Sequence, residues 1–364
     1  MQIQHLILKL NLYAYKPGLL CFTTAFVVTM LIMPPLIKII NRFRLFDMPD
    51  LRKAHNTPIP TMGGIAVYAG MVAALFLWYR FTGDLFTVSF FFSLAVLFAL
   101  GIMDDLKDIP AHYKLAIQLG VALLVALSGV RVTSFEGLFG VYTLPLPVQY
   151  GFTLFVIVGI TNAFNLIDGI DGLAGSLGFM SLIAVALFLT LSGQTGPAII
   201  AFALSGALLG FLYYNFNPAR IFMGDTGSLV LGFTIAVLSI LLIRTNAGMI
   251  QPVLTNVPVV ALSVVLIPAF DTLRVFSLRI GRGRSPFHPD KTHIHHLLTN
   301  NGWSHSFTSR LICCLHGFVL MLGFLTHHLK PEVSLLFMVV VMLMAVYTLK
   351  KLRLPAPKKQ LQLD

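Results

Sequence analysis

The sequence predicts an all-α membrane protein: one bundle of about eleven transmembrane helices, forming a single domain over residues 1–364. Apolar residues make up 57% of the chain and charged residues 11%, with a mean hydropathy of +0.86. That composition is too apolar for a water-soluble domain of this length. Runs of almost uninterrupted apolar residues recur along the whole chain, each close to the ~20 residues that cross a ~30 Å hydrocarbon core as a helix. Strands of a membrane barrel would instead alternate in polarity.

Each apolar run is predicted to be one helix, and in the shorter runs the polar flanks must share the span. The first run is expected to be a retained helix, because no small-x-small cleavage pattern follows it. Cys21, Cys313 and Cys314 lie within predicted helices and indicate neither a disulfide framework nor a metal cluster. In chain order the runs are 18–40, 63–79, 85–102, 115–130, 148–160, 173–192, 198–213, 228–243, 257–270, 311–325 and 333–349.

The net charge of +11 raises the alternative of a nucleic-acid partner, but the placement of the charges argues against it. Threading eleven helices from an outside N-terminus puts 18 of the 25 Lys and Arg residues in inward loops and the C-terminal tail. The positive-inside rule therefore predicts the orientation of a multi-pass membrane protein. Its C-terminus is expected to be cytoplasmic, its N-terminus periplasmic or external, and its basic tail 350–364 to lie against anionic lipid.

Five short polar segments hold most of the carboxylates, and the same threading places all five on the cytoplasmic side. Ionised groups beside hydrocarbon are costly and usually functional, so this convergence predicts one composite site in the cytoplasmic loops. The longest polar stretch, 274–310, is expected to be a large substrate-binding loop. The five polar segments are 47–64, 104–114, 162–172, 215–228 and 274–296.

Two of these segments carry paired carboxylates. Asp104 and Asp105 end a predicted helix, where a site and a merely solvated helix end are equally open. Asp168 and Asp171 belong to two Asp-Gly pairs between membrane helices, and a helical turn would put both on one face. Carboxylates that close repel each other unless a cation joins them. A plain interhelical turn needs only one such pair, so function is favoured over turn chemistry.

The fourth segment places Asp225 and Thr226 at the start of the eighth helix. Their oxygens suit either a helix N-cap or a divalent cation. The segment lacks the Gly-x4-Gly-Lys-Ser/Thr pattern of a P-loop, so that kind of nucleotide site is excluded.

The fifth segment combines arginines with histidines, a chemistry that suits a diphosphate. Arginine forks bind phosphate oxygens, and histidines donate hydrogen bonds or transfer protons. A zinc site competes, but no cysteine is near, and the carboxylates elsewhere resemble ligands for a hard cation. Positive-inside charge with incidental histidines is the other alternative. The basic charge of the first segment is explained by topology alone.

Together the five segments offer carboxylates for Mg²⁺ and basic side chains for phosphates at a membrane surface. Phosphoryl transfer needs chiefly positioning and charge neutralisation, which these groups supply. A proton- or ion-coupled transporter is the alternative from another class, but it predicts carboxylates near the bilayer midplane and related repeat halves. An inactive scaffold that binds lipid carriers is a third option.

These motifs resemble the polyprenyl-phosphate N-acetylhexosamine-1-phosphate transferases, glycosyltransferase family 4. The histidine segment is most similar to the bacterial branch that uses undecaprenyl phosphate and N-acetylglucosamine (GlcNAc). The branch that transfers phospho-MurNAc-pentapeptide carries three consecutive histidines and a lysine in place of Asp108, so the chain departs from it at both places. The resemblance rests on Arg52 and Lys53, 60–64, Asp104 and Asp105, 162–172, 222–228 and 285–296.

The resemblance implies a Mg²⁺-dependent enzyme, with Mn²⁺ as a substitute. The phosphate of undecaprenyl phosphate attacks the β-phosphorus of a UDP-N-acetylhexosamine, most simply UDP-GlcNAc, and UMP leaves. UDP-GalNAc, a modified UDP-N-acetylhexosamine and UDP-MurNAc-pentapeptide are the alternative donors. The reaction would take place in the bacterial cytoplasmic (inner) membrane, and the product would begin a cell-envelope polysaccharide such as O-antigen. The expected partners are these two substrates and membrane lipid, with a homodimer as one option and no nucleic acid.

The resemblance also implies a role for individual residues. Asp225 is expected to bind Mg²⁺ with Asp171, while Asn165 and Phe222 contact the uridine. The expected catalytic residues are Asp104, Asp105 and Asp168. The residues expected to bind the diphosphate or sugar are Lys53, Lys114, Arg282, Arg284, His293, His295 and His296.

Overall fold

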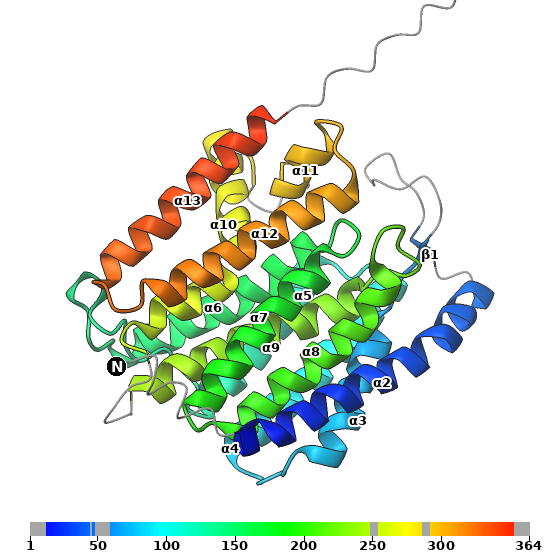
Figure 1. Cartoon of the computed structure of the whole chain (residues 1–364), viewed down its shortest axis with the longest axis horizontal. Helices are drawn as coiled ribbons and strands as arrows, with labels where there is room; N and C mark the ends of the chain where they lie inside the picture. Colours follow the sequence, from blue (N-terminus) through cyan, green and yellow to red (C-terminus); the bar gives the residue numbers. More distant parts are fainter. Residues whose placement is uncertain (1–11, 44–45, 48–58, 248–253, 286–291, 353–364) are drawn as a thin grey trace, which may run out of the picture.

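The chain forms a bundle of membrane helices in a computed structural model that describes residues 12–43, 46–47, 59–247, 254–285 and 292–352. Within these residues, nine helices are long and apolar enough to cross a membrane, and two shorter apolar helices join them. The predicted eleven-helix bundle is therefore confirmed (Figure 1). The eleven are α2 (Leu12–Phe43), α3 (Gly64–Trp78), α4 (Leu85–Lys107), α5 (Ala111–Leu127), α6 (Leu146–Ile167), α7 (Leu173–Leu191), α8 (Thr195–Asn215), α9 (Gly224–Ala247), α10 (Val257–Gly281), α12 (His305–Leu325) and α13 (Pro331–Lys351).

Short elements complete the connections between these helices. Strands β1 (Phe46–Asp47) and β2 (Ile59–Pro60) pair antiparallel, with Phe46 opposite Pro60. A 3-10 turn, η1 (Leu138–Gly140), lies between α5 and α6, and α11 (Ile294–Thr299) lies between α10 and α12.

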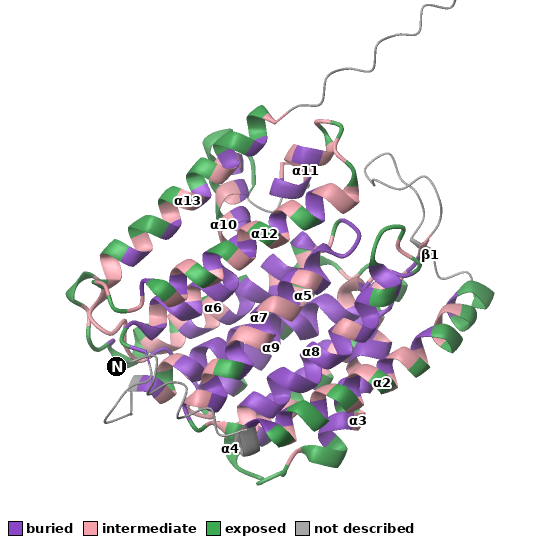
Figure 2. Ribbon diagram, in the orientation of Figure 1, coloured by how far each residue is buried: buried purple, intermediate pink, exposed green. Residues whose placement is uncertain are grey.

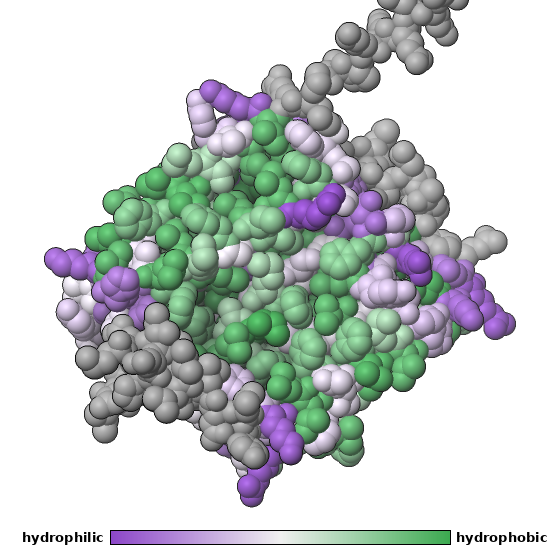
Figure 3. Space-filling view, viewed as in Figure 1, coloured by the Kyte–Doolittle hydropathy of each residue, from purple (hydrophilic) through white to green (hydrophobic). Residues whose placement is uncertain are grey.

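Helix α9 is the centre of the bundle. Of its most apolar 18 residues 94% are buried, against 28% for α13 at the edge of the molecule (Figures 1 and 2). Apolar side chains such as Leu31, Phe76 and Met344 are exposed instead. Figure 3 shows a broad apolar surface with polar residues gathered toward its borders, as expected where lipid is the solvent.

Glycines allow two helices to approach the start of α9 closely. A Cβ added at Gly101 on α4 would lie 2.4 Å from Thr226 Cα, and one added at Gly64 on α3 would lie 2.2 Å from the Gly227 nitrogen. The backbone N–H groups of Gly63 and Gly64 also donate to the carbonyls of Phe222 and Met223. Small residues let membrane helices pack backbone against backbone, so α3 and α4 are fixed against α9 at one end of the bundle.

Several helices extend beyond the apolar runs and carry the polar residues on their first or last turns. Helix α4 includes Asp104 and Asp105, α6 includes Asn165, and α9 begins one residue before Asp225. Helix α10 continues through Gly281, so the stretch 274–310 contains the end of α10, all of α11 and the start of α12 as well as connecting loop. Hydropathy misses these turns because their backbone hydrogen bonds continue although their side chains are polar.

We predict that Gly101→Ala destabilises the protein by about 1–3 kcal/mol or more, because the added methyl overlaps the Thr226 backbone. The matched control is Gly159→Ala on α6, where nothing lies within 4 Å of an added Cβ. That change is expected to be neutral or to stabilise the helix by up to about 1 kcal/mol. Thermal unfolding in detergent measures both variants, and equal midpoints would contradict the close packing of α4 on α9.

Candidate active site

The described parts of the five polar segments are linked by contacts, and the first, second and third segments meet the fourth at the first turn of α9. The end of the first segment pairs with the fourth through Gly63, Gly64 and Phe222. The second and third segments reach the fourth through side chains described below. The third also contacts the fifth, since a Cβ added at Gly169 would lie 2.7 Å from Nε2 of His295. The fourth segment therefore contacts three of the other segments and lies at the centre of the site.

Asp105 holds the first turn of α9. Its carboxylate accepts hydrogen bonds from the Asp225 and Thr226 backbone N–H groups, at 2.8 and 3.1 Å, and from the Thr226 hydroxyl. Backbone N–H groups at a helix start lack partners within the helix and favour a negative charge there. Gly224 has a φ of +72°, and a Cβ there would lie 2.6 Å from the same carboxylate. The structure thus gives Asp105 a capping contact, and a catalytic role for it stays a prediction.

Asp225 lies at the centre of a polar cluster formed by three other helices. The Lys114 ammonium of α5 lies 3.2 Å from one Asp225 oxygen and 2.6 Å from Asp104 of α4. The Asn165 amide of α6 donates to the other Asp225 oxygen at 2.8 Å and to the Ser228 hydroxyl at 3.0 Å. Both oxygens of Asp225 are therefore positioned. The roles predicted for Lys114 and Asn165 toward phosphate and uridine stay predictions, because both side chains contact Asp225 here.

An amide pair, formed by the buried Gln118 and the half-buried Asn162, lies one helical turn below these contacts. The Asn162 amide of α6 donates to Gln118 of α5 at 2.6 Å and to the Val158 carbonyl at 2.8 Å. Gln118 is four residues from Lys114 on α5, and Asn162 is three residues from Asn165 on α6, so each amide shares a helix face with a partner of Asp225. This pair fixes the rotation of α5 against α6. The sequence analysis missed Gln118, whose only signal is a polar side chain within an apolar run.

The expectation that Asp168 and Asp171 share one helical face is wrong. Helix α6 ends at Ile167, and the next residues form a turn in which Gly172 has a φ of +73°. Asp168 faces the α9 side, where burial and the carboxylates of Asp225 and Asp105 raise its pKa to about 7, although a Gly224 N–H opposes the shift.

Asp171 faces different partners from Asp168. Its carboxylate accepts hydrogen bonds from Asn217 at 2.9 Å, from the Ala219 N–H at 3.1 Å and from His305 at 3.2 Å. Burial raises the pKa of Asp171, but these hydrogen bonds outweigh burial and hold it below its ordinary value. The structure therefore does not give Asp171 and Asp225 common partners, and the predicted metal role of Asp171 stays a prediction.

Asp271 of α10 holds the histidine segment and was missed by the sequence analysis. Its carboxylate accepts hydrogen bonds from Arg274 at 2.7 Å, from His293 at 2.9 Å and from the Ile294 N–H at 3.0 Å. Its only sequence signal is an acidic residue at the end of an apolar run. His295 is 2% exposed, and burial lowers its pKa to about 3, so it stays neutral at physiological pH. His293 and His295 are thus both packed into the protein.

Five other residues are predicted from the sequence to bind uridine, phosphate or sugar. Phe222 is half-buried beside the first segment, and its backbone N–H donates to the Pro60 carbonyl. Arg282 and Arg284 are exposed where α10 ends, and His296 is half-buried on α11. Lys53 lies outside the described residues.

The described side chains supply some of the oxygen ligands that a hard divalent cation needs. Within the described ranges, no three His, Cys, Asp or Glu side chains are grouped as a ready metal site. Mg²⁺ commonly uses only one or two carboxylates and completes its shell with water and substrate phosphates. Asp225 and Asp168 provide such carboxylates, and after burial the charge of Asp225 is the next cause of the raised pKa of Asp168. The donor set therefore fits Mg²⁺ bound together with a diphosphate.

We predict that Gln118→Leu lowers stability by about 1 kcal/mol, because the half-buried Asn162 amide loses a partner. The double variant Gln118→Leu/Asn162→Leu removes both amides and should regain much of that stability. Its turnover should nevertheless remain about 5-fold low or lower if the pair aligns Lys114 and Asn165. Unfolding midpoints and steady-state rates separate these effects, and wild-type turnover in the double variant would contradict the positioning role.

We also predict that the metal-free protein loses stability as the pH rises from about 4 to about 7. The carboxyl group of Asp168 is protonated in the folded state up to a pKa of about 7, but ionises near 3.9 in an unfolded chain. The unfolded chain thus releases the proton first, and rising pH favours unfolding. Asp168→Asn should flatten this slope in unfolding scans between pH 5 and 8 with a chelator present. An unchanged slope in the variant would contradict the assignment.

Comparisons with known proteins identify the family of the chain. Residues 87–243 match the model of glycosyl transferase family 4. The chain is 36% identical over 293 residues, 80% of each chain, to the probable undecaprenyl-phosphate N-acetylglucosaminyl 1-phosphate transferase of Bacillus subtilis strain 168. It is 33% identical over 305 residues to the undecaprenyl-phosphate alpha-N-acetylglucosaminyl 1-phosphate transferase of Escherichia coli K12, covering 81% of this chain and 80% of that one. The protein is therefore a member of glycosyl transferase family 4.

Proposed function

We propose that this protein transfers GlcNAc-1-phosphate from UDP-GlcNAc to undecaprenyl phosphate. The observation that carries the proposal is the cluster of Asp225, Lys114, Asn165 and Asp104 at the membrane-helix ends, in a chain whose relatives bear the name of this activity. A lipid phosphate and a water-soluble nucleotide sugar can meet only near the membrane surface, which is where helix ends lie. The product would be undecaprenyl-diphosphate-GlcNAc, the first membrane intermediate of a cell-envelope polysaccharide.

The proposed reaction is a direct displacement at phosphorus. An oxygen of the lipid phosphate forms a bond to the β-phosphorus of UDP-GlcNAc. The bond from that phosphorus to the oxygen bridging the α-phosphate breaks, and UMP leaves with the electron pair. A phosphate monoester has its second pKa near 6, so the nucleophile is already largely ionised at neutral pH. No side chain then needs to remove a proton from the nucleophile, and Asp104 is assigned to orient Lys114.

Charge neutralisation is the main task left to the side chains. Lys114 carries a positive charge between Asp104 and Asp225, and we assign it to the lipid phosphate or the diphosphate once substrates bind. Mg²⁺ would be held by Asp225 with Asp168, and when bound it offsets the negative charge of the diphosphate. Asn165 fixes the rotamer of Asp225 in that role.

The placement of the carboxylates favours this enzyme over an ion-coupled transporter. Asp104 and Asp105 lie on the last turn of α4, and Asp225 on the first turn of α9. These positions are at helix ends rather than midway along a span. We propose that this end faces the cytoplasm, because the basic loops and the basic tail follow the positive-inside rule. A homodimer stays a prediction.

The direct test supplies purified protein with undecaprenyl phosphate and Mg²⁺ and follows the release of UMP. UDP-GlcNAc, UDP-GalNAc and UDP-MurNAc-pentapeptide are offered in separate reactions. The proposal expects UMP from UDP-GlcNAc only when lipid and Mg²⁺ are both present. UMP from another donor alone would keep the chemistry and change the sugar, and silence with all three donors would contradict the proposal.

We predict that Asp225→Asn lowers turnover by more than about 100-fold, the upper end of the loss seen when an outer-shell metal partner is removed. The amide keeps the shape of the side chain but removes the charge that would hold Mg²⁺. Asp84→Asn is the matched control, since Asp84 caps the opposite end of α4. The control should keep near wild-type turnover in the UMP assay. A fully active Asp225→Asn enzyme would refute the metal assignment.

A further inference from the structure

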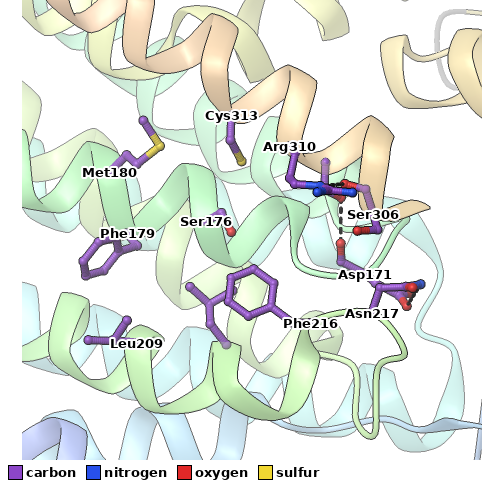
Figure 4. Close-up of a pocket in the computed structure, with 12 residues that line it drawn as sticks. Asp171, Ser176, Phe179, Met180, Leu209, Phe216, Asn217, Ser306, Arg310 and Cys313 are labelled. Atoms are coloured by element: carbon purple, nitrogen blue, oxygen red, sulfur yellow. Dashed lines mark hydrogen bonds between the residues drawn. The ribbon is translucent and has the colours of Figure 1, made fainter. Parts of the chain in front are cut away.

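A cavity of about 530 Å³ lies between α7, α8 and α12, outside the cluster around Asp225. One end of it is lined by apolar side chains, among them Phe179, Met180, Leu209 and Leu212. Its other end is polar, with Asp171, Asn217, Ser306 and Arg310 grouped together in Figure 4. The volume is in the range of ordinary ligand sites. The cavity thus offers an apolar compartment that continues into a polar end.

The cavity opens toward the lipid-facing side of the bundle. Helices α7, α8 and α12 are all candidate membrane spans. Phe179, Met180, Leu209 and Cys313 are only partly buried, so the wall that they form is reached from outside the protein. An amphiphile in the membrane can therefore enter sideways with its apolar chain leading.

The charge at the polar end of the cavity determines which lipid headgroup fits there. Arg310 is exposed, its Nε donates to the Ser306 carbonyl at 3.1 Å, and no ion pair involves it within the described part of the chain. The nearby carboxylate of Asp171 is occupied by Asn217, the Ala219 N–H and His305. A guanidinium with unused N–H groups binds phosphate oxygens well. The polar end of the cavity therefore complements an anionic phosphate more than a zwitterionic headgroup.

From this geometry we infer a binding site for an anionic phospholipid, with one acyl chain in the cavity and its phosphate at Arg310. The acceptor lipid fits less well, because its phosphate must reach the cluster of Asp225, Lys114 and Asp104, and none of these residues lines the cavity. The site contacts the turn between α6 and α7 through Asp171, whose carbonyl accepts a hydrogen bond from Ser309 at 2.7 Å. Bound lipid would brace the turn that carries Asp168.

The thiol of Cys313 provides a direct probe of the cavity. Cys313 lines the cavity, Cys314 is exposed and does not line it, and Cys21 is fully buried. The full-length protein, stripped of lipid in detergent, is labelled with N-ethylmaleimide in two backgrounds. Cys314→Ser reports on Cys313, and Cys313→Ser reports on Cys314. Mass spectrometry follows the rate, with phosphatidylglycerol or phosphatidylcholine of the same acyl chains added.

The inference expects phosphatidylglycerol, at ten times its dissociation constant, to slow labelling of Cys313 about tenfold, because only the empty site reacts. Labelling of Cys314 should not change, and phosphatidylcholine should protect Cys313 much less. Arg310→Gln should remove the protection, whereas Arg42→Gln, which neutralises an exposed arginine on α2, should keep it. Ser176→Phe, whose ring fills the cavity, should slow labelling of Cys313 without any lipid.

Three results would overturn the inference. Equal protection by both phospholipids, unaffected by Arg310→Gln, would remove the role of the phosphate. Protection by undecaprenyl phosphate but not by phosphatidylglycerol would make the acceptor the occupant. Labelling that no lipid slows would show that no lipid enters. These readouts do not depend on turnover, so they stand apart from the outcome of the UMP assay.

Discussion

The contact between Asp105 and the first turn of α9 determines where every other polar group of the site can lie. The Asp105 carboxylate accepts hydrogen bonds from two backbone N–H groups and from the Thr226 hydroxyl. Gly101 lets α4 approach the same turn. A buried helix start without such a partner would leave its first N–H groups without a hydrogen bond. Once α4 and α9 are joined here, Asp104 and Asp225 must lie near each other, and a cation must balance them.

The cluster around Asp225 balances these charges by shared hydrogen bonds and one ammonium group. Lys114 contacts both Asp104 and Asp225, and Asn165 occupies the other Asp225 oxygen. Burial first, and then the nearby carboxylates of Asp225 and Asp105, raise the pKa of Asp168 to about 7. A divalent cation with a nucleotide diphosphate would relieve the repulsion among these carboxylates. The site is thus arranged to gain stability when substrate and metal arrive, which is an arrangement suited to phosphoryl transfer.

Hydropathy and charge placement predicted the eleven membrane helices and the meeting of the five polar segments, because both follow from the solvent that each residue requires. The partners of single carboxylates could not be predicted that way. Asp168 and Asp171 diverge because α6 ends at Ile167 and the turn at Gly172 reverses the chain. The capping role of Asp105 and the anchoring role of Asp271 depend on residues more than 20 positions away. Only tertiary packing selects those partners.

The binding of Mn²⁺ in the presence of UDP-GlcNAc, followed by electron paramagnetic resonance, tests the assignment of Asp225 most directly. The account predicts that wild-type protein binds Mn²⁺, that Asp225→Asn loses it, and that Asp171→Asn keeps it, since Asp171 is held by Asn217, Ala219 and His305. Mn²⁺ retained by Asp225→Asn and lost from Asp171→Asn would contradict the account and move the metal to the other side of the turn.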